Sequence, residues 1–228
     1  MRRTPPLSST TPGAEGRPVS YAILLACVAI VLARAETLDR IAVTVGRHVI
    51  TESDVVLDLR VAAFLDGRTP DFSGAQRRSA AARLVDLYFV LQDAAVSRAP
   101  EPTPADVDAL MEPVRARYGS DADYRAALER AGISENDVRE HLFAGLRMMR
   151  YTELRFRPEV QITEQDLHRA FDALSAKQPA GSPAPGFEAN RAKLEELVMN
   201  QRILEALDRW LALMRSETPI LYRDAAFR

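Results

Sequence analysis

Residues suited to acid–base, metal or redox chemistry are few in this chain of 228 residues. It contains three histidines, His48, His141 and His168, and one cysteine, Cys27. A single cysteine excludes a disulfide framework and a zinc site built from several cysteines. The histidines fall in separate predicted elements, and we interpret His141 and His168 as side chains at the surface or at the edge of the core. The sequence therefore predicts no metal site.

Two close pairs of carboxylates, Glu52 with Asp54 and Glu135 with Asp137, are the remaining candidates for general acid–base catalysis. Each pair lies in the first turn of a predicted helix, where negative charge complements the helix dipole and contributes at most about 1 kcal/mol. The chain has neither a glycine-rich phosphate loop nor the G-x-S-x-G turn of serine hydrolases. We therefore predict that the protein is not an enzyme and has no catalytic residue, no cofactor and no bound nucleotide.

The numbers of basic and acidic residues indicate which classes of partner the protein is suited to bind. The chain carries 30 lysines and arginines against 32 aspartates and glutamates, which gives a formal net charge of −2. Proteins that bind nucleic acids usually show a basic excess or a basic stripe, so this balance predicts no nucleic-acid partner. Apolar residues make up 47% of the chain and charged residues 27%, as is typical of a folded protein.

Residues 1–35 are typical of a secretory signal peptide with an extended N-terminal tail. A basic tail rich in Pro, Ser and Thr precedes the uncharged run Tyr21–Leu32, and the A-x-A sequence Ala33–Ala35 follows it. The run is shorter than the ~20 apolar residues that span a bilayer. We expect export to the periplasm. The alternative is an uncleaved N-terminal anchor, which would be the protein's only membrane contact.

The elements that must position any site begin with a short β-hairpin. Residues 41–45 alternate, with the apolar side chains of the odd-numbered positions on one face, and residues 48–50 form the returning strand. An isolated hairpin is only marginally stable, and a third strand stabilises it. We therefore predict that the C-terminal segment Ile220–Tyr222 pairs with Ile41–Val45.

The rest of the chain is predicted to be helical, which makes the fold mainly α. Each expected helix start is marked by a serine or threonine that can accept a backbone N–H of the first turn. These N-caps are Thr51, Ser73, Thr103, Ser120, Ser134 and Thr163. We expect a helical region over residues 36–176, a Pro/Gly-rich linker over 177–186, and a C-terminal segment, 187–228, that completes the same domain. The long helix of that segment carries the apolar stripe Leu194, Leu197, Leu204, Leu207, Leu211 and Met214.

The predicted helix Glu135–Phe156 is apolar on more than one side. A helix of this kind is either buried all round or offers a surface to a partner. Methionine adapts its shape and is common on promiscuous binding surfaces. The candidate client-binding residues are Phe143, Met148, Met149, Tyr151, Leu154 and Phe156. Because Arg147, Arg150, Arg155 and Arg157 lie among them, we expect a mixed apolar and cationic groove. The alternative is that this helix is the central helix of the core.

Three short motifs resemble those of SurA-type periplasmic chaperones. The segment Asp39–Asp54 is similar to the family's opening "D-x-I-x-A-x-V-N-x-x-x-I-T-x-S-[ED]", with Gly46 in place of the usual Asn. Ile162–Asp166 looks like the "v-T-e-e-e" helix start that precedes the isomerase insert in the family. The sequence from Trp210 through Ile220-Leu-Tyr222 resembles the closing helix and strand. The resemblance covers residues 38–222 and implies a helical chaperone core with a small terminal sheet.

The departure from the family concerns the parvulin-type prolyl isomerase domain. Family members commonly carry this domain between the "T-e-e-e" helix and the closing helix, whereas here that interval holds only the linker around 176–186. The resemblance therefore implies an ATP-independent holdase that binds unfolded or partly folded exported polypeptides, including outer-membrane proteins, without isomerase activity. The alternative is a non-catalytic envelope adaptor that binds one dedicated protein partner through the same helical face.

Overall fold

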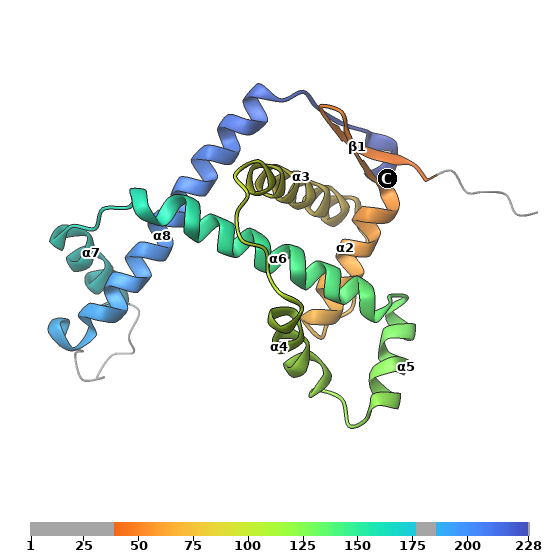
Figure 1. Cartoon of the computed structure of the whole chain (residues 1–228), viewed down its shortest axis with the longest axis horizontal. Coiled ribbons are helices and arrows are strands. Elements are labelled where there is room, and N and C mark those ends of the chain that lie inside the picture. The colour runs from red at the N-terminus through yellow and green to blue at the C-terminus, as the bar shows by residue number, and fades with distance from the viewer. Residues whose placement is uncertain (1–38, 177–185, 228) are drawn as a thin grey trace, which may run out of the picture. The chain divides into compact units, whose positions relative to one another are not determined.

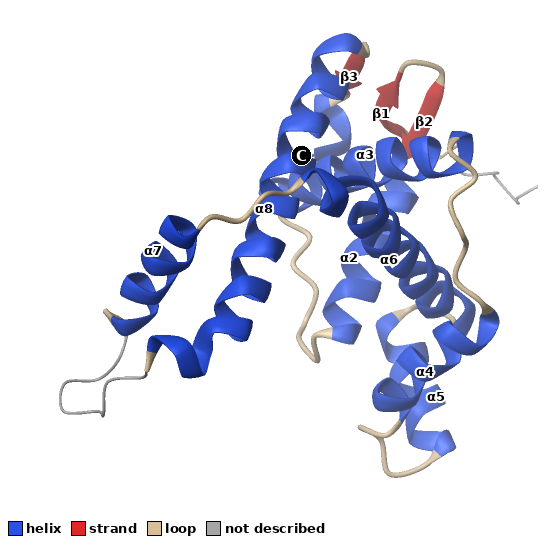
Figure 2. Cartoon of the chain, turned by 60° about the vertical axis from the view of Figure 1, so that its left-hand side comes forward, coloured by secondary structure: helices blue, strands red, loops and turns tan. Residues whose placement is uncertain are grey.

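Seven α-helices and one three-stranded antiparallel sheet make up the part of the chain that the structure describes, residues 39–176 and 186–227 of a computed structural model (Figures 1 and 2). The prediction of a mainly α fold is therefore confirmed. The expected linker 177–186 and the expected signal peptide 1–35 lie almost entirely outside the described residues.

The sheet joins the two ends of the described chain. Its strands are β1 (Ile41–Val45), β2 (His48–Thr51) and β3 (Ile220–Tyr222), in the order β2-β1-β3. Val43 of β1 pairs with Tyr222 of β3, which confirms the predicted third strand. Figure 2 shows β3 beside the β1–β2 hairpin. The turn between β1 and β2 places Gly46 at φ +57°, a conformation that glycine adopts without steric cost.

The first strand departs from the strict alternation that its sequence indicates. The pairing between β1 and β2 shifts between Ile41 and Val43, as in a β-bulge. Residues that precede such a shift in the strand point to the opposite face of the sheet from the one that strict alternation predicts. Ile41 is consequently 43% exposed while Ala42 is fully buried, so the expectation that positions 41, 43 and 45 share one buried face is wrong at position 41.

The helices begin where the caps predict. Their bounds are α2 (Glu52–Leu65), α3 (Gly74–Val96), α4 (Pro104–Arg115), α5 (Asp121–Ala131), α6 (Glu135–Phe156), α7 (Glu164–Ser175) and α8 (Phe187–Glu217). The hydroxyls of Thr51, Thr103, Ser134 and Thr163 each close a capping box with an aspartate three residues later. Ser120 caps α5 through the Asp123 amide, whereas the Ser73 side chain makes no such bond at α3.

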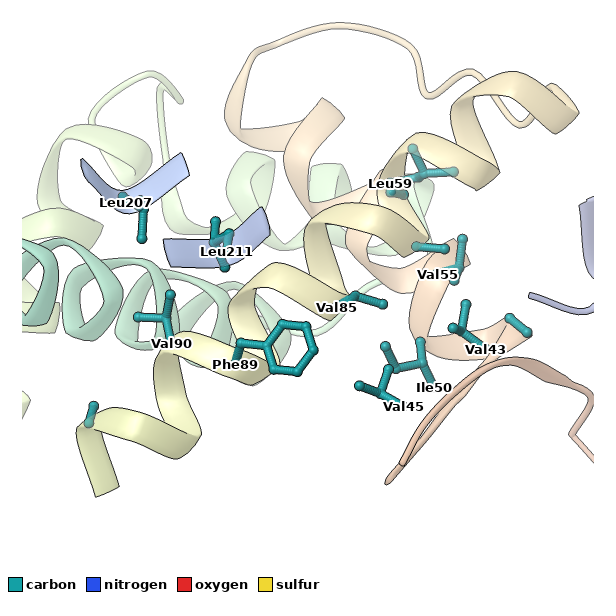
Figure 3. Close-up of a cluster of buried hydrophobic side chains, with 14 of the residues drawn as sticks. Val43, Val45, Ile50, Val55, Leu59, Val85, Phe89, Val90, Leu207 and Leu211 are labelled. Atoms are coloured by element: carbon teal, nitrogen blue, oxygen red, sulfur yellow. The ribbon is translucent and has the colours of Figure 1, made fainter. Parts of the chain in front are cut away.

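The largest hydrophobic cluster packs the sheet against α2, α3, α6 and α8 (Figure 3). Val43 and Val45 of β1 are buried in it together with Val85 of α3 and Leu211 of α8. The helix α6 contacts α2, α3, α4 and α8, so the alternative prediction of a central core helix is confirmed. The helix α6 is therefore packed between several neighbouring helices.

Two further clusters lie beside the main one. The second joins α4 and α5 to α2 and α6 around the fully buried Met111. The third joins α7 to the first half of α8 and buries only Leu167, Leu194 and Val198. The predicted stripe of α8 is wrong at Leu197 and Leu204, which are 49% and 58% exposed. Among the described residues, none of the helices has the length and apolar character needed to cross a membrane.

Candidate functional site: an apolar groove with an acidic rim

The structure places two of the six predicted client-binding residues in the core. Tyr151 and Phe156 retain only 3% and 4% of their accessible surface. The Tyr151 hydroxyl donates a hydrogen bond to Asp93, and its burial raises the pKa of the phenol. The Phe156 ring packs against Trp210 with 6.2 Å between the ring centroids. Both assignments to a client-binding surface are therefore wrong, because side chains with so little accessible surface have almost nothing to offer a client.

The other four predicted residues do not form one surface. Phe143 is half-buried against the second cluster, and Met148 is half-buried against the first. Met149 and Leu154 are exposed by 58% and 57%. Met148 alone among the six lines the groove that is described below.

The predicted cationic character of this helix is cancelled by local ion pairs. Arg150 donates two hydrogen bonds, of 2.9 and 2.7 Å, to the carboxylate of Asp106, and they lower the pKa of Asp106 well below its usual range. The other three arginines of the predicted groove are paired as well: Arg147 with Glu101, Arg155 with Glu159, and Arg157 with Glu153. Because all four arginines are paired with carboxylates, the expectation of a mixed apolar and cationic groove on this helix is wrong.

A groove of about 930 Å³ lies instead among α2, α3, α6 and α8, with β2 at one end. Its apolar lining includes Leu57 of α2, Leu84 and Leu87 of α3, Met148 of α6 and the 41% exposed Val49 of β2. A volume of this size is at the upper end of the range seen in ligand-binding clefts, roughly 300–1,000 Å³. The groove can accept several apolar side chains of a partner at once.

Small residues of α6 keep this groove open. Ala144 and Gly145 both line it, and a Cβ atom added at Gly145 would have no heavy atom within 4 Å. A glycine within a helix costs roughly 0.5–1 kcal/mol relative to alanine. The sequence signal for this wall was the pair Ala144-Gly145 in mid-helix, together with His141 and Met148 on the same side at helical spacing.

The rim of the groove is acidic. Eight carboxylates and two arginines line it. The carboxylates are Asp54, Asp58, Asp66, Asp71, Asp86, Asp137, Glu140 and Asp208. Arg83 pairs with Asp58 at 2.7 Å, and Arg68 pairs with Asp66 at 2.9 Å. Arg215, which does not line the groove, pairs with Asp86. Because the other five carboxylates have no ion-pair partner among the described residues, the rim keeps a negative field.

The three histidines lie in different surroundings, and each is near another ring or a carboxylate. His141 lines the groove, with its Nδ1 atom 3.7 Å from an oxygen of Asp58. His48 stacks on Tyr88, and His168 stacks on Phe187. No group of three or more potential metal ligands occurs among the residues that the structure describes. The arrangement offers apolar area framed by fixed negative charge, which suits binding.

Comparison with known proteins adds no relative. No protein-family model matches the chain, and no curated protein gives a significant match. The likeness to SurA-type chaperones therefore rests on the three short motifs alone.

Proposed function

We propose that the protein is an ATP-independent holdase of the bacterial envelope, without prolyl isomerase activity. It binds apolar segments of unfolded exported polypeptides, outer-membrane proteins among them, in the groove between α2, α3, α6 and α8. The observation that carries this proposal is the open apolar lining, from Leu57 and Leu84 to Met148, beside the unfilled space at Gly145. Export by the N-terminal segment 1–35 belongs to the same proposal.

The physical basis of binding is the burial of apolar area. Each Å² of apolar surface removed from water contributes about 25 cal/mol, and ordering of the unfolded client offsets part of this gain. Binding and release are then passive and need no nucleotide. The sheet that joins β1 to β3 is the arrangement that the SurA-type motifs imply, and it supports the proposal because it closes the core on which the groove stands.

The test is the aggregation of a chemically unfolded outer-membrane protein after dilution into buffer, followed by light scattering with and without the purified chain. We expect suppression at equimolar amounts. The variant Gly145→Phe places a ring in the groove and should lose most of this activity, whereas Gly145→Ala leaves the groove open and should keep it. Both variants replace the same exposed residue, so their comparison separates groove filling from a loss of fold.

Absence of suppression by the unaltered chain at stoichiometric amounts would overturn the holdase proposal. The same result, with one folded envelope protein co-purifying at a fixed stoichiometry, would support an adaptor in its place.

A further inference from the structure

We infer that the groove selects apolar segments that carry lysine or arginine side chains, because its rim is acidic. This inference rests on the proposed function and names the class of client. The carboxylates of the rim come from separate elements: Asp71 from the loop between α2 and α3, Glu140 from α6, and Asp208 from α8. They therefore come from three segments that are far apart in the chain.

Much of this negative charge is left for a partner. Within residues 39–176 and 186–227, no ion pair involves Asp54, Asp71, Asp137, Glu140 or Asp208. Asp54 and Asp137 accept backbone N–H groups in capping boxes, and Glu140 accepts a hydrogen bond from Asn136. Glu140 and Asp208 are exposed, so both can meet a cationic group without breaking an existing ion pair.

The chemistry of basic side chains fits the two layers of this site. Lysine and arginine lay their alkyl stems along apolar surface and keep the charged end in water. In the groove, the stems contact Leu84 and Leu87 while the charged ends reach the carboxylates of the rim. An acidic client of equal apolar content meets like charge instead, and like-charge juxtaposition disfavours binding. The rim therefore discriminates by charge, and the lining provides affinity.

The experiment uses three fluorescent peptides of equal length and identical apolar residues, whose polar positions are all Lys, all Gln or all Glu. Binding to the purified chain is measured by fluorescence anisotropy at low salt and at 0.5 M NaCl. We expect the Lys peptide to bind about tenfold more tightly than the Gln peptide at low salt, and the Glu peptide to bind most weakly. High salt should reduce this spread because it screens exposed charges.

A matched pair of double variants assigns the effect to the rim. Glu140→Gln with Asp208→Asn removes two carboxylates from the groove, and Glu129→Gln with Asp172→Asn removes two exposed ones from α5 and α7. Both variants change the net charge of the protein equally. We expect the first to lose most of the preference for the Lys peptide and the second to keep it.

The outcomes separate this inference from the proposed function. Equal binding of all three peptides, with aggregation still suppressed, overturns the charge selection and leaves the holdase. No peptide binding and no suppression overturns both. Concentration-dependent dimerisation that Gly145→Phe abolishes, without peptide binding, assigns the groove to a second copy of the chain and also overturns the inference.

Discussion

The main cluster and the α7–α8 cluster are stabilised by different kinds of contact. The main cluster buries 19 residues from the sheet, four helices and the C-terminal 3-10 turn, whereas the α7–α8 cluster buries three. Around those three, Asp166 accepts hydrogen bonds from Thr163, Arg169 and Arg202. One region therefore depends on apolar burial and the other in large part on a buried carboxylate.

The groove is lined in part by residues of the main cluster, which makes that cluster the source of its rigidity. Leu59, Leu207 and Leu211 belong both to the main cluster and to the lining of the groove. None of the residues of the α7–α8 cluster lines it. We therefore expect changes in the main cluster to affect the groove and the whole fold together, and changes in α7 to leave both largely intact.

The largest expected effect is that of Val43→Asp in the main cluster. Val43 is fully buried in β1, so the variant places an unpaired carboxylate in an apolar site and should lose about 4 kcal/mol or more of the free energy of unfolding. Urea denaturation followed by circular dichroism measures this loss. Leu221→Asp is the control in the same sheet, because Leu221 is 49% exposed. Similar losses in the two variants would contradict the burial pattern.

The next largest effect should stay local. Leu194→Ala removes the fully buried side chain of the α7–α8 cluster, and truncations of this kind cost about 2–5 kcal/mol. We expect faster amide exchange in α7 and in the start of α8, with the exchange of α2 and α3 unchanged, as measured by hydrogen–deuterium exchange. Leu197→Ala, one turn away at an exposed position, should change little. Faster exchange throughout the main cluster would show that the two regions unfold together.

Lowering the pH should destabilise the α7–α8 cluster more than the main cluster. Hydrogen bonds from the Thr163 hydroxyl and backbone N–H, and then from Arg202 and Arg169, lower the pKa of Asp166 well below its usual value of 3.8. A carboxylate with a lowered pKa stabilises the folded state above the unfolded value, and this contribution is lost as the pH falls through and below about 4. We expect the protection factors of the α7 amides, which compare the observed exchange rate with the intrinsic rate at the same pH, to be lower at pH 3 than at pH 6, and those of Asp166→Asn to be low at both. If the α7 amides of Asp166→Asn stayed highly protected at both pH values, this role of Asp166 would be contradicted.

The smallest expected effect is a gain. Gly145→Ala adds a methyl group to open space in mid-helix and should stabilise the protein by about 0.5–1 kcal/mol. For a chain of this size the melting temperature should rise by a few degrees, which differential scanning calorimetry measures. A fall in melting temperature would mean that the wall of the groove at this position is already filled.

The local elements were largely predictable, and the surface of α6 was not. The bounds Glu135–Phe156 follow from Ser134 and Pro158, which act within one turn of themselves. The exposed face of the same helix depends on four neighbouring helices, so Tyr151 is buried while Met149 is exposed. The shift of pairing at Ile41 was also missed, because alternation alone does not indicate a bulge.

The sequence by itself determined the helix starts, the hairpin and the strand that joins it, because caps, turns and period-two patterns act over a few residues. Only the tertiary structure decided that the open groove lies on the Gly145 side of α6 and that its rim is acidic. The physical reason is that these features depend on residues far apart in the chain. The arginines in and next to α6 are neutralised by carboxylates that the fold brings close to them. The carboxylates of the rim come from several separate segments.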